Sequence, residues 1–206
     1  MNMRIYVAGE DSIGRKALLQ TYVTGTCDKG EYSSYLLEKL VKKVKIDNKD
    51  INVEIGIDEG GENIRYNRKF SYIFADVIIF CFCLVNPYSY SQIETEFYED
   101  FIKYCKDKPY ILVGLKKDKR ENFKTSIENN YHEKGKIDRK KGERLKEKIK
   151  AEYYIECSSW EHENINEVFE TAIKLCLNKN QNKNEDKNKL STKPKKANSK
   201  AICNLY

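Results

Sequence analysis

Two glycines and the residues around them form the segment of this chain best suited to bind phosphate. The segment spans residues 9–16, between an apolar run at 5–8 that predicts a strand and a helical pattern at 15–24. Gly9 and Gly14 have the spacing of a phosphate-binding loop, or P-loop, whose backbone N–H groups surround phosphates. The spacing alone is weak evidence because the chain has ten glycines. The strand–loop–helix context strengthens it, so we predict a phosphate site here.

The chemistry of this loop is altered at its end. In a P-loop the second glycine is followed by a lysine that reaches the phosphates and a hydroxyl that binds Mg²⁺. This chain has Arg15 and Lys16 at those positions, so a cation is retained and the hydroxyl is lost. The loop residues that we expect to contact a nucleotide are Gly9, Glu10, Asp11, Ser12, Ile13, Gly14, Arg15, Lys16 and Ala17.

Three more polar motifs each follow a predicted strand. Asp58 could hold Mg²⁺ through water, and Gly61 could offer its N–H to a γ-phosphate, although a glycine-rich turn explains both residues as well. Asp118 could accept two hydrogen bonds from guanine while the stem of Lys116 packs on the base; solvated charge is the plainer interpretation.

The last motif, Ser158-Ser159, could donate backbone N–H groups to guanine O6 or cap the next turn. Each motif is weak by itself. Because ligands bind over the carboxyl ends of strands in an open α/β sheet, four motifs in the correct order, each at a strand end, predict one shared site.

The elements that must position these residues alternate along the chain. Alternating apolar residues around a turn at 47–50 predict a hairpin with one wet face, in which Val41, Val44 and Ile46 form the apolar side of the first strand. Continuous apolar runs predict buried strands at 76–85, 109–114 and 153–157. Helical patterns occupy 92–105, 139–150 and 165–177. We therefore expect an α/β fold with a six-stranded, mostly parallel sheet, one antiparallel edge strand and helices on both faces.

Charge divides the chain into two regions. Residues 178–206 contain eight lysines and two acidic residues, a surplus of six that equals the net charge of the whole chain. We expect a nearly neutral domain at 1–177 and a disordered basic tail at 178–206, which argues against a nucleic-acid-binding core.

No stretch has the length and apolarity of a membrane span, and no leader precedes Arg4, so we expect the chain to begin in the cytosol. Cys81 and Cys83 lie in an apolar run and are predicted to be core residues, because no second pair of ligands lies nearby.

With these motifs in place, the chain resembles a Ras-like small GTPase of the Rho/Rac branch from about residue 3 to 177. The resemblance rests on the stretches ADVIIFCFCLVNP at 75–87, PYILVGLKKDKR at 109–120 and YIECSS at 154–159. Lysine-rich residues 120–140 match the place of the extra helical insert of Rho proteins. The end of the chain, Cys203-Asn-Leu-Tyr206, resembles a prenylation box behind a basic segment, which implies a lipid on Cys203.

The resemblance also shows where the chain departs from the family. The positions of the two Mg²⁺-coordinating hydroxyls hold Lys16 and Tyr35, and the aromatic that flanks guanine is replaced by Asp28. Glu62 occupies the position of the water-orienting glutamine, and Asp11 stands where a glycine usually faces the γ-phosphate. Two added carboxylates near a triphosphate disfavour binding, and Asp11 would block an arginine finger, so we expect impaired hydrolysis.

Two functions follow from these observations. The first is a monomeric Rho-like GTPase that binds GTP or GDP weakly, depends little on Mg²⁺ and turns over slowly. The resemblance implies effectors at its switch regions, exchange factors, activating proteins and an anionic surface at the cytoplasmic face of the plasma membrane, with a cytosolic pool. The alternative is a scaffold that keeps the fold and binds partners without nucleotide switching. A nucleic-acid binder is disfavoured because the excess charge is confined to the tail.

Overall fold

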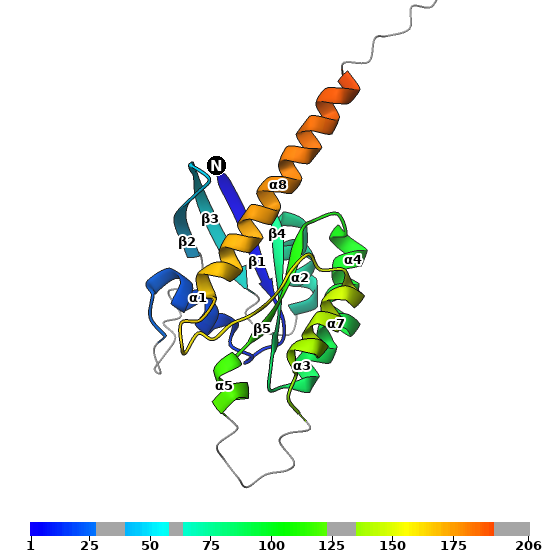
Figure 1. Cartoon of the computed structure of the whole chain (residues 1–206). Coiled ribbons are helices and arrows are strands. Elements are labelled where there is room, and N and C mark those ends of the chain that lie inside the picture. Colours follow the sequence, from blue (N-terminus) through cyan, green and yellow to red (C-terminus); the bar gives the residue numbers. More distant parts are fainter. Residues whose placement is uncertain (28–39, 58–63, 123–134, 192–206) are drawn as a thin grey trace, which may run out of the picture.

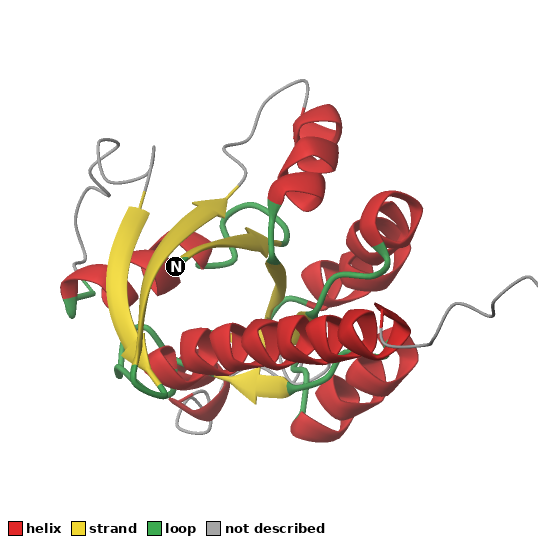
Figure 2. Ribbon diagram, turned by 90° about the horizontal axis from the view of Figure 1, so that it is seen from above, coloured by secondary structure: helices red, strands yellow, loops and turns green. Residues whose placement is uncertain are grey.

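The computed structural model describes residues 1–27, 40–57, 64–122 and 135–191 (Figure 1). A single six-stranded sheet forms its centre, with strand order β2-β3-β1-β4-β5-β6. β2 pairs antiparallel with β3, and every other neighbouring pair is parallel, which confirms the predicted sheet. The strands are β1 Asn2–Ala8, β2 Leu40–Ile46, β3 Lys49–Ile57, β4 Val77–Cys83, β5 Tyr110–Leu115 and β6 Tyr154–Glu156. Seen from above, the sheet is curved (Figure 2).

Helices cover both faces of the sheet, as predicted. Side chains of α1 Arg15–Thr24 and α8 Ile165–Ser191 join one buried apolar cluster with alternate residues of the strands. On the other face, a second cluster contains residues from α2 Ile64–Phe74, α4 Glu99–Cys105 and α7 Arg139–Ile149. The predicted helix at 92–105 is part of a longer helical stretch made of α3 Pro87–Gln92, the π-helical η2 Ile93–Tyr98 and α4. A short helix, α5 Lys117–Asn122, follows β5.

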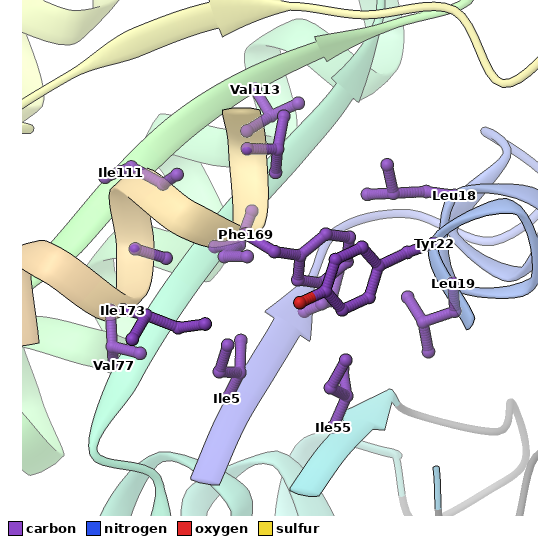
Figure 3. Close-up of a cluster of buried hydrophobic side chains, with 14 of the residues drawn as sticks. Ile5, Leu18, Leu19, Tyr22, Ile55, Val77, Ile111, Val113, Phe169 and Ile173 are labelled. Carbon is purple, nitrogen blue, oxygen red and sulfur yellow. The ribbon is translucent and has the colours of Figure 1, made fainter. Parts of the chain in front are cut away.

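The first cluster is organised around two stacked rings. The ring of Tyr22 from α1 lies 3.9 Å from that of Phe169 from α8, in a nearly parallel arrangement. Ile5, Ile55 and Ile173 surround this pair in Figure 3, so β1, β3 and α8 meet at α1. α1 is the helix that follows the P-loop, and this packing holds it against the sheet.

The hairpin is present, but the inward face of its first strand differs from the prediction, because Val41 points outward and Lys42 points inward. Asp47 and Asn48 form the turn with positive φ angles of 48° and 59°, as a two-residue hairpin turn requires. Residues 40, 42, 44 and 46 share one face because side chains alternate along a strand, so the outward Val41 is 57% exposed. The inward Lys42 places its ammonium 3.9 Å from the centre of the Tyr22 ring and donates to the Tyr22 carbonyl. Burial lowers the pKa of Lys42.

The C-terminal helix is longer than predicted. A disordered segment was expected from residue 178, whereas α8 continues to Ser191 and projects beyond the sheet (Figure 1). A helix already anchored by its packed first turns needs no new nucleus, so residues 178–191 continue it although five of them are asparagines, which favour a helix less than lysine does. Among the described residues, no helix is long and apolar enough to cross a membrane.

Two more predictions concern the middle of the chain. Cys81 and Cys83 are both buried in β4, as the prediction of core residues required. In the region of the expected Rho-type insert, α5 ends at Asn122 and α7 begins at Arg139. Residues 123–134, which hold most of that insert, lie outside the described residues.

Candidate nucleotide-binding site

The segments predicted to form one site lie at the carboxyl ends of β1, β5 and β6. The side chain of Lys116, just after β5, donates to the Ser12 carbonyl in the loop after β1 at 2.9 Å. The buried hydroxyl of Ser158, after β6, donates to Asp118 Oδ1 at 2.7 Å. These two contacts connect three segments that are about forty or more residues apart, so the loop after β1 lies beside Lys116, and Asp118 lies beside Ser158. The fourth predicted segment, at Asp58, lies outside the described residues.

The two glycines of the loop have backbone conformations that other residues rarely adopt. Gly9 has a φ of 151°, and a Cβ there would lie 2.3 Å from the Cys81 carbonyl oxygen of β4. Gly14 has a φ of 114° and is the N-cap of α1. The Lys116 stem crosses this glycine, since a Cβ on Gly14 would lie 3.2 Å from Lys116 Cε. Both glycines are therefore required for the loop to lie close to its neighbours.

Arg15, at the position of the P-loop lysine, is buried and paired within the loop. Its side chain is 5% exposed, and its Nη2 lies 2.7 Å from Oδ1 of Asp11, whose own side chain is 59% exposed. A second, longer hydrogen bond runs from Nη1 to the Val7 carbonyl at 3.4 Å. Lys16, the next residue, is exposed. Arg15, the cation expected to bind phosphate, is thus paired with Asp11, the carboxylate expected to repel phosphate.

A second carboxylate adds negative charge to this loop. Glu10 is partly buried, and burial raises the pKa of its carboxyl. The carboxylates of Glu96 and Asp11 raise that pKa further, against the opposing effect of Arg68 and Arg15. The remaining loop residues differ in exposure: Ser12 is exposed, Ile13 is buried in the core, and Ala17 is partly buried.

The segment that holds Asp118 has a support that was not predicted from the sequence. Glu156, in β6, is 4% exposed and accepts hydrogen bonds from Arg120 Nη1 and Nη2 at 2.8 and 2.5 Å. Tyr154 Oη donates to the same carboxylate at 2.8 Å. Arg120 lies in α5, two residues after Asp118, so this network fixes the helix that holds Asp118. A signal was present: a carboxylate inside an apolar strand needs a partner.

A buried arginine in α2 was also missed. Arg68 is 2% exposed and its Nη1 lies 2.8 Å from Glu96 Oε1 and 3.0 Å from Asp100 Oδ2. Its guanidinium also lies 4.0 Å from the centre of the Phe97 ring. Glu96 and Phe97 belong to η2, so Arg68 attaches α2 to the π-helical turn. No periodic pattern marks an arginine as buried, so only the spacing of acidic residues in 94–100 could have suggested it.

Asp58, Gly61 and Glu62 lie outside the described residues, as do Asp28, Tyr35 and Cys203. Ser159 is partly exposed beside the buried Ser158. Within the described ranges, no group of three or more His, Cys, Asp or Glu side chains could hold a metal ion.

Comparison with known proteins agrees with this arrangement. The sequence model of the Ras family matches residues 4–178. The chain belongs to the Ras family. It is 29% identical over 174 residues to the GTP-binding protein rho5 of Schizosaccharomyces pombe, covering 84% of this chain and 86% of that protein. It is 26% identical over 175 residues to the Rho-related GTP-binding protein RhoF of Bos taurus, covering 85% and 81% respectively.

The chain is therefore a Ras-family protein similar to Rho GTPases, with a P-loop GTPase fold. In this Ras-family chain the matched residues end at 178, whereas α8 continues to Ser191. The match includes every described residue of the predicted nucleotide site, from Gly9 to Ser159.

Proposed function

We propose that this chain is a monomeric, membrane-tethered Rho-like GTPase that binds guanine nucleotide weakly and hydrolyses GTP slowly. The observation that supports binding is the pair of contacts from Lys116 to the Ser12 carbonyl and from Ser158 to Asp118. They bring the loop that is predicted to bind phosphate close to the carboxylate that is predicted to accept hydrogen bonds from guanine. A surface scaffold alone would not need Asp118 to be 8% exposed and oriented by a buried hydroxyl.

The residues at the base end fit a guanine. Asp118 would accept hydrogen bonds from N1–H and the exocyclic amine, and the Lys116 stem would pack on the base. Backbone N–H groups of Ser158 and Ser159 are candidates for O6, although the Ser158 N–H already donates to the Glu163 carbonyl at 3.1 Å. Ser159 is therefore the better donor of the two. When bound, the nucleotide supplies a γ-phosphate whose cleavage changes the state of the protein.

The residues at the phosphate end fit less well. Loop 9–17 offers the glycine backbone and Arg15, but Arg15 is already paired with Asp11. Lys16 has no lone pair with which to coordinate Mg²⁺. These two features support weak binding and a minor role for Mg²⁺. They are also the specific observations that favour the second candidate function, a scaffold that does not switch.

The exposed face of α2 supports partner binding at the switch regions, whichever candidate function holds. Tyr66, Phe70, Ile73 and Phe74 are 64%, 40%, 40% and 60% exposed and recur at helical spacing. The rings of Tyr66 and Phe70 lie 5.1 Å apart. Because the opposite side of α2 is attached to η2 through Arg68, this apolar face is held outward. We infer that effectors, exchange factors or activating proteins bind it.

The nucleotide proposal is tested first on the purified wild-type protein. Bound nucleotide is released by denaturation and identified by chromatography, and GDP or GTP at well below one per chain is expected because the proposed binding is weak; titration with a labelled guanine nucleotide then gives the affinity. Next, Asp118→Asn should reduce affinity for GDP and raise affinity for xanthosine diphosphate, because the amide offers a donor where xanthine carries an oxygen. Lys119→Gln, an exposed neighbour, is the matched control and should change neither affinity. An empty site in the purified protein, with no change of base preference in Asp118→Asn, would favour the scaffold.

A further inference from the structure

The P-loop of this chain contains both a buried arginine, Arg15, and the carboxylate that neutralises it, Asp11. Arg15 is 5% exposed, and its shortest polar contact is the 2.7 Å bond to Asp11 Oδ1. Its other hydrogen bond, to the Val7 carbonyl, is 3.4 Å long. Asp11 is therefore the main group that compensates the buried guanidinium, since a buried charge without a partner is strongly destabilising.

The charge of the loop is also balanced internally. Residues 9–16 contain two acidic residues, Glu10 and Asp11, and two basic residues, Arg15 and Lys16, which sum to zero. Of the two basic side chains, Lys16 is exposed, so Arg15 is the one positioned inside the loop. A phosphate entering this loop finds its buried cation already bound to a carboxylate.

The two partners differ in how easily they can separate. Arg15 extends from the first turn of α1 and is enclosed by the core, whereas the Asp11 side chain is 59% exposed. Asp11 can therefore leave into water, where a carboxylate is well solvated, and the guanidinium stays in place. When the Asp11 side chain is displaced, Arg15 is free to bind another anion that accepts hydrogen bonds from a guanidinium, such as a phosphate group.

We propose that the Asp11 carboxylate acts as a built-in competitor for phosphate at Arg15. The Asp11 carboxylate stabilises the loop when no nucleotide is bound, and a nucleotide binds only by displacing it. This inference depends on the proposed nucleotide binding for its biological meaning, but it concerns only the anion site.

The competition is measured with inorganic pyrophosphate, which has no base and reports the anion site alone. Nucleotide-free wild-type protein, Asp11→Asn, Arg15→Gln and the double variant are titrated by calorimetry. Asp11→Asn keeps the side-chain size and removes the charge, so pyrophosphate affinity should rise about tenfold or more. In the Arg15→Gln background the same change should have a much smaller effect, because the pair is already absent.

Glu10→Gln is the matched control, since it removes an equal charge from the neighbouring loop position without breaking the Arg15–Asp11 pair. It should raise pyrophosphate affinity by less than about threefold. Equal effects of Glu10→Gln and Asp11→Asn would mean general repulsion and would overturn the proposal. So would pyrophosphate affinity that Asp11→Asn leaves unchanged.

Thermal unfolding gives a second readout that needs no tight binding. Without ligand, Asp11→Asn should melt a few degrees below wild type because Arg15 loses its carboxylate, and saturating pyrophosphate should restore the loss. An Asp11→Asn protein that melts at the wild-type temperature contradicts the proposal.

The proposed function and this inference can fail separately. If GDP does not bind but Asp11→Asn raises pyrophosphate affinity as expected, only the proposed function is rejected. If GDP binds but Asp11→Asn does not raise pyrophosphate affinity, only this inference is rejected.

Discussion

At the residue scale, the charged side chains buried around the candidate site each have a specific partner in the described part of the chain. The pairs are Arg15 with Asp11, Arg68 with Glu96 and Asp100, Glu156 with Arg120, and Asp118 with Ser158. Because an uncompensated buried charge costs several kcal/mol, these pairs fix the positions of their side chains more firmly than apolar contacts would.

Glu156 should make folding sensitive to acid. Burial alone would raise the pKa of Glu156, but hydrogen bonds from Arg120 and Tyr154 outweigh burial and hold that pKa below the ordinary 4.5. The stability from the ionised group is therefore full above pH 4.5 and is lost as the pH falls through the lower pKa of the folded state. Glu156→Gln should lower the unfolding free energy at pH 7 by about 3 kcal/mol and flatten its acid dependence. Urea unfolding at pH 7, 4 and 3 measures both effects; the exposed Glu152→Gln is the control, and an equally steep acid limb in both variants would refute the assignment.

Lys16 should make nucleotide binding nearly independent of Mg²⁺. An ammonium cannot complete an octahedral Mg²⁺ shell, and Tyr35 stands at the other expected ligand position. Fluorescence titration of a labelled guanine nucleotide with Mg²⁺ and with EDTA should give affinities within a few-fold of each other. A loss of a hundredfold or more on chelation would contradict this expectation.

The two substituted carboxylates should slow GTP cleavage. Asp11 and Glu62 replace a small residue and a water-orienting amide in the family pattern, so a Rho-type activating protein should give little acceleration. The double variant Glu62→Gln, Asp11→Gly should recover part of the rate in single-turnover assays. Ordinary turnover of the unmodified protein with activator would show that other groups have taken over the chemistry.

At the element scale, close helix–sheet contacts position the site. α7 approaches β6 so closely that a Cβ on Gly142 would lie 2.1 Å from Tyr154 Cζ. The hydroxyl of Tyr154 belongs to the Glu156–Arg120 network, so this contact transmits the position of α7 to the residues that support Asp118. α2 is attached in a similar way, through Arg68 to η2 and through the Tyr72 hydroxyl to the Phe97 carbonyl at 3.0 Å.

Gly142→Ala should therefore destabilise the protein despite the better helix propensity of alanine. Propensity favours the change by about 1 kcal/mol. The forced movement of Tyr154 opposes it by about 1–3 kcal/mol or more, and the aromatic ring is fixed by its hydrogen bond to Glu156. Chemical denaturation is expected to show a net loss, with Gly56→Ala as control because a Cβ there meets nothing within 4 Å. A stabilised Gly142→Ala protein would mean that α7 can shift at no cost.

At the scale of the whole molecule, charge separates a nearly neutral domain from a basic end. The surplus of six positive charges in residues 178–206 equals the net charge of the chain. Part of this segment extends α8 away from the sheet, and residues 192–206 lie outside the described part. The domain itself thus offers little overall attraction for an anionic surface.

Membrane attachment should require two signals in this end of the chain. A single lipid on Cys203 would give only marginal affinity, and each lysine near an anionic leaflet would add about 1 kcal/mol. Cys203→Ser should leave the protein in the cytosolic fraction. Replacement of Lys193, Lys195, Lys196 and Lys200 by Gln should remove it from the plasma membrane while lipidation, followed by mass spectrometry, persists. A Cys203→Ser protein that pellets with membranes at both low and high salt would exclude the lipid anchor.

The sequence by itself determined the strands, most helix positions and the chain segments that meet at the site. These features depend on local patterns: buried strands are apolar throughout, helices repeat every 3.6 residues, and loops follow strand ends. The six mostly parallel strands, the position of the P-loop after β1 and the strand-end positions of Lys116, Asp118 and Ser158 could be predicted. The order of the strands in the sheet and the helix α2 were not predicted.

Only the tertiary structure decided which charges are buried and which partners they have. Glu156 meets Arg120 across 36 residues, and Arg68 meets Glu96 across 28, so no local periodicity can encode either pair. Sequence reasoning assigned Arg15 and Asp11 opposite effects on phosphate, and the fold placed them 2.7 Å apart. The direction of a side chain such as Lys42 likewise follows from strand register. Burial and pairing are properties of the assembled core, because the free energy of a charge depends on neighbours that only folding brings together.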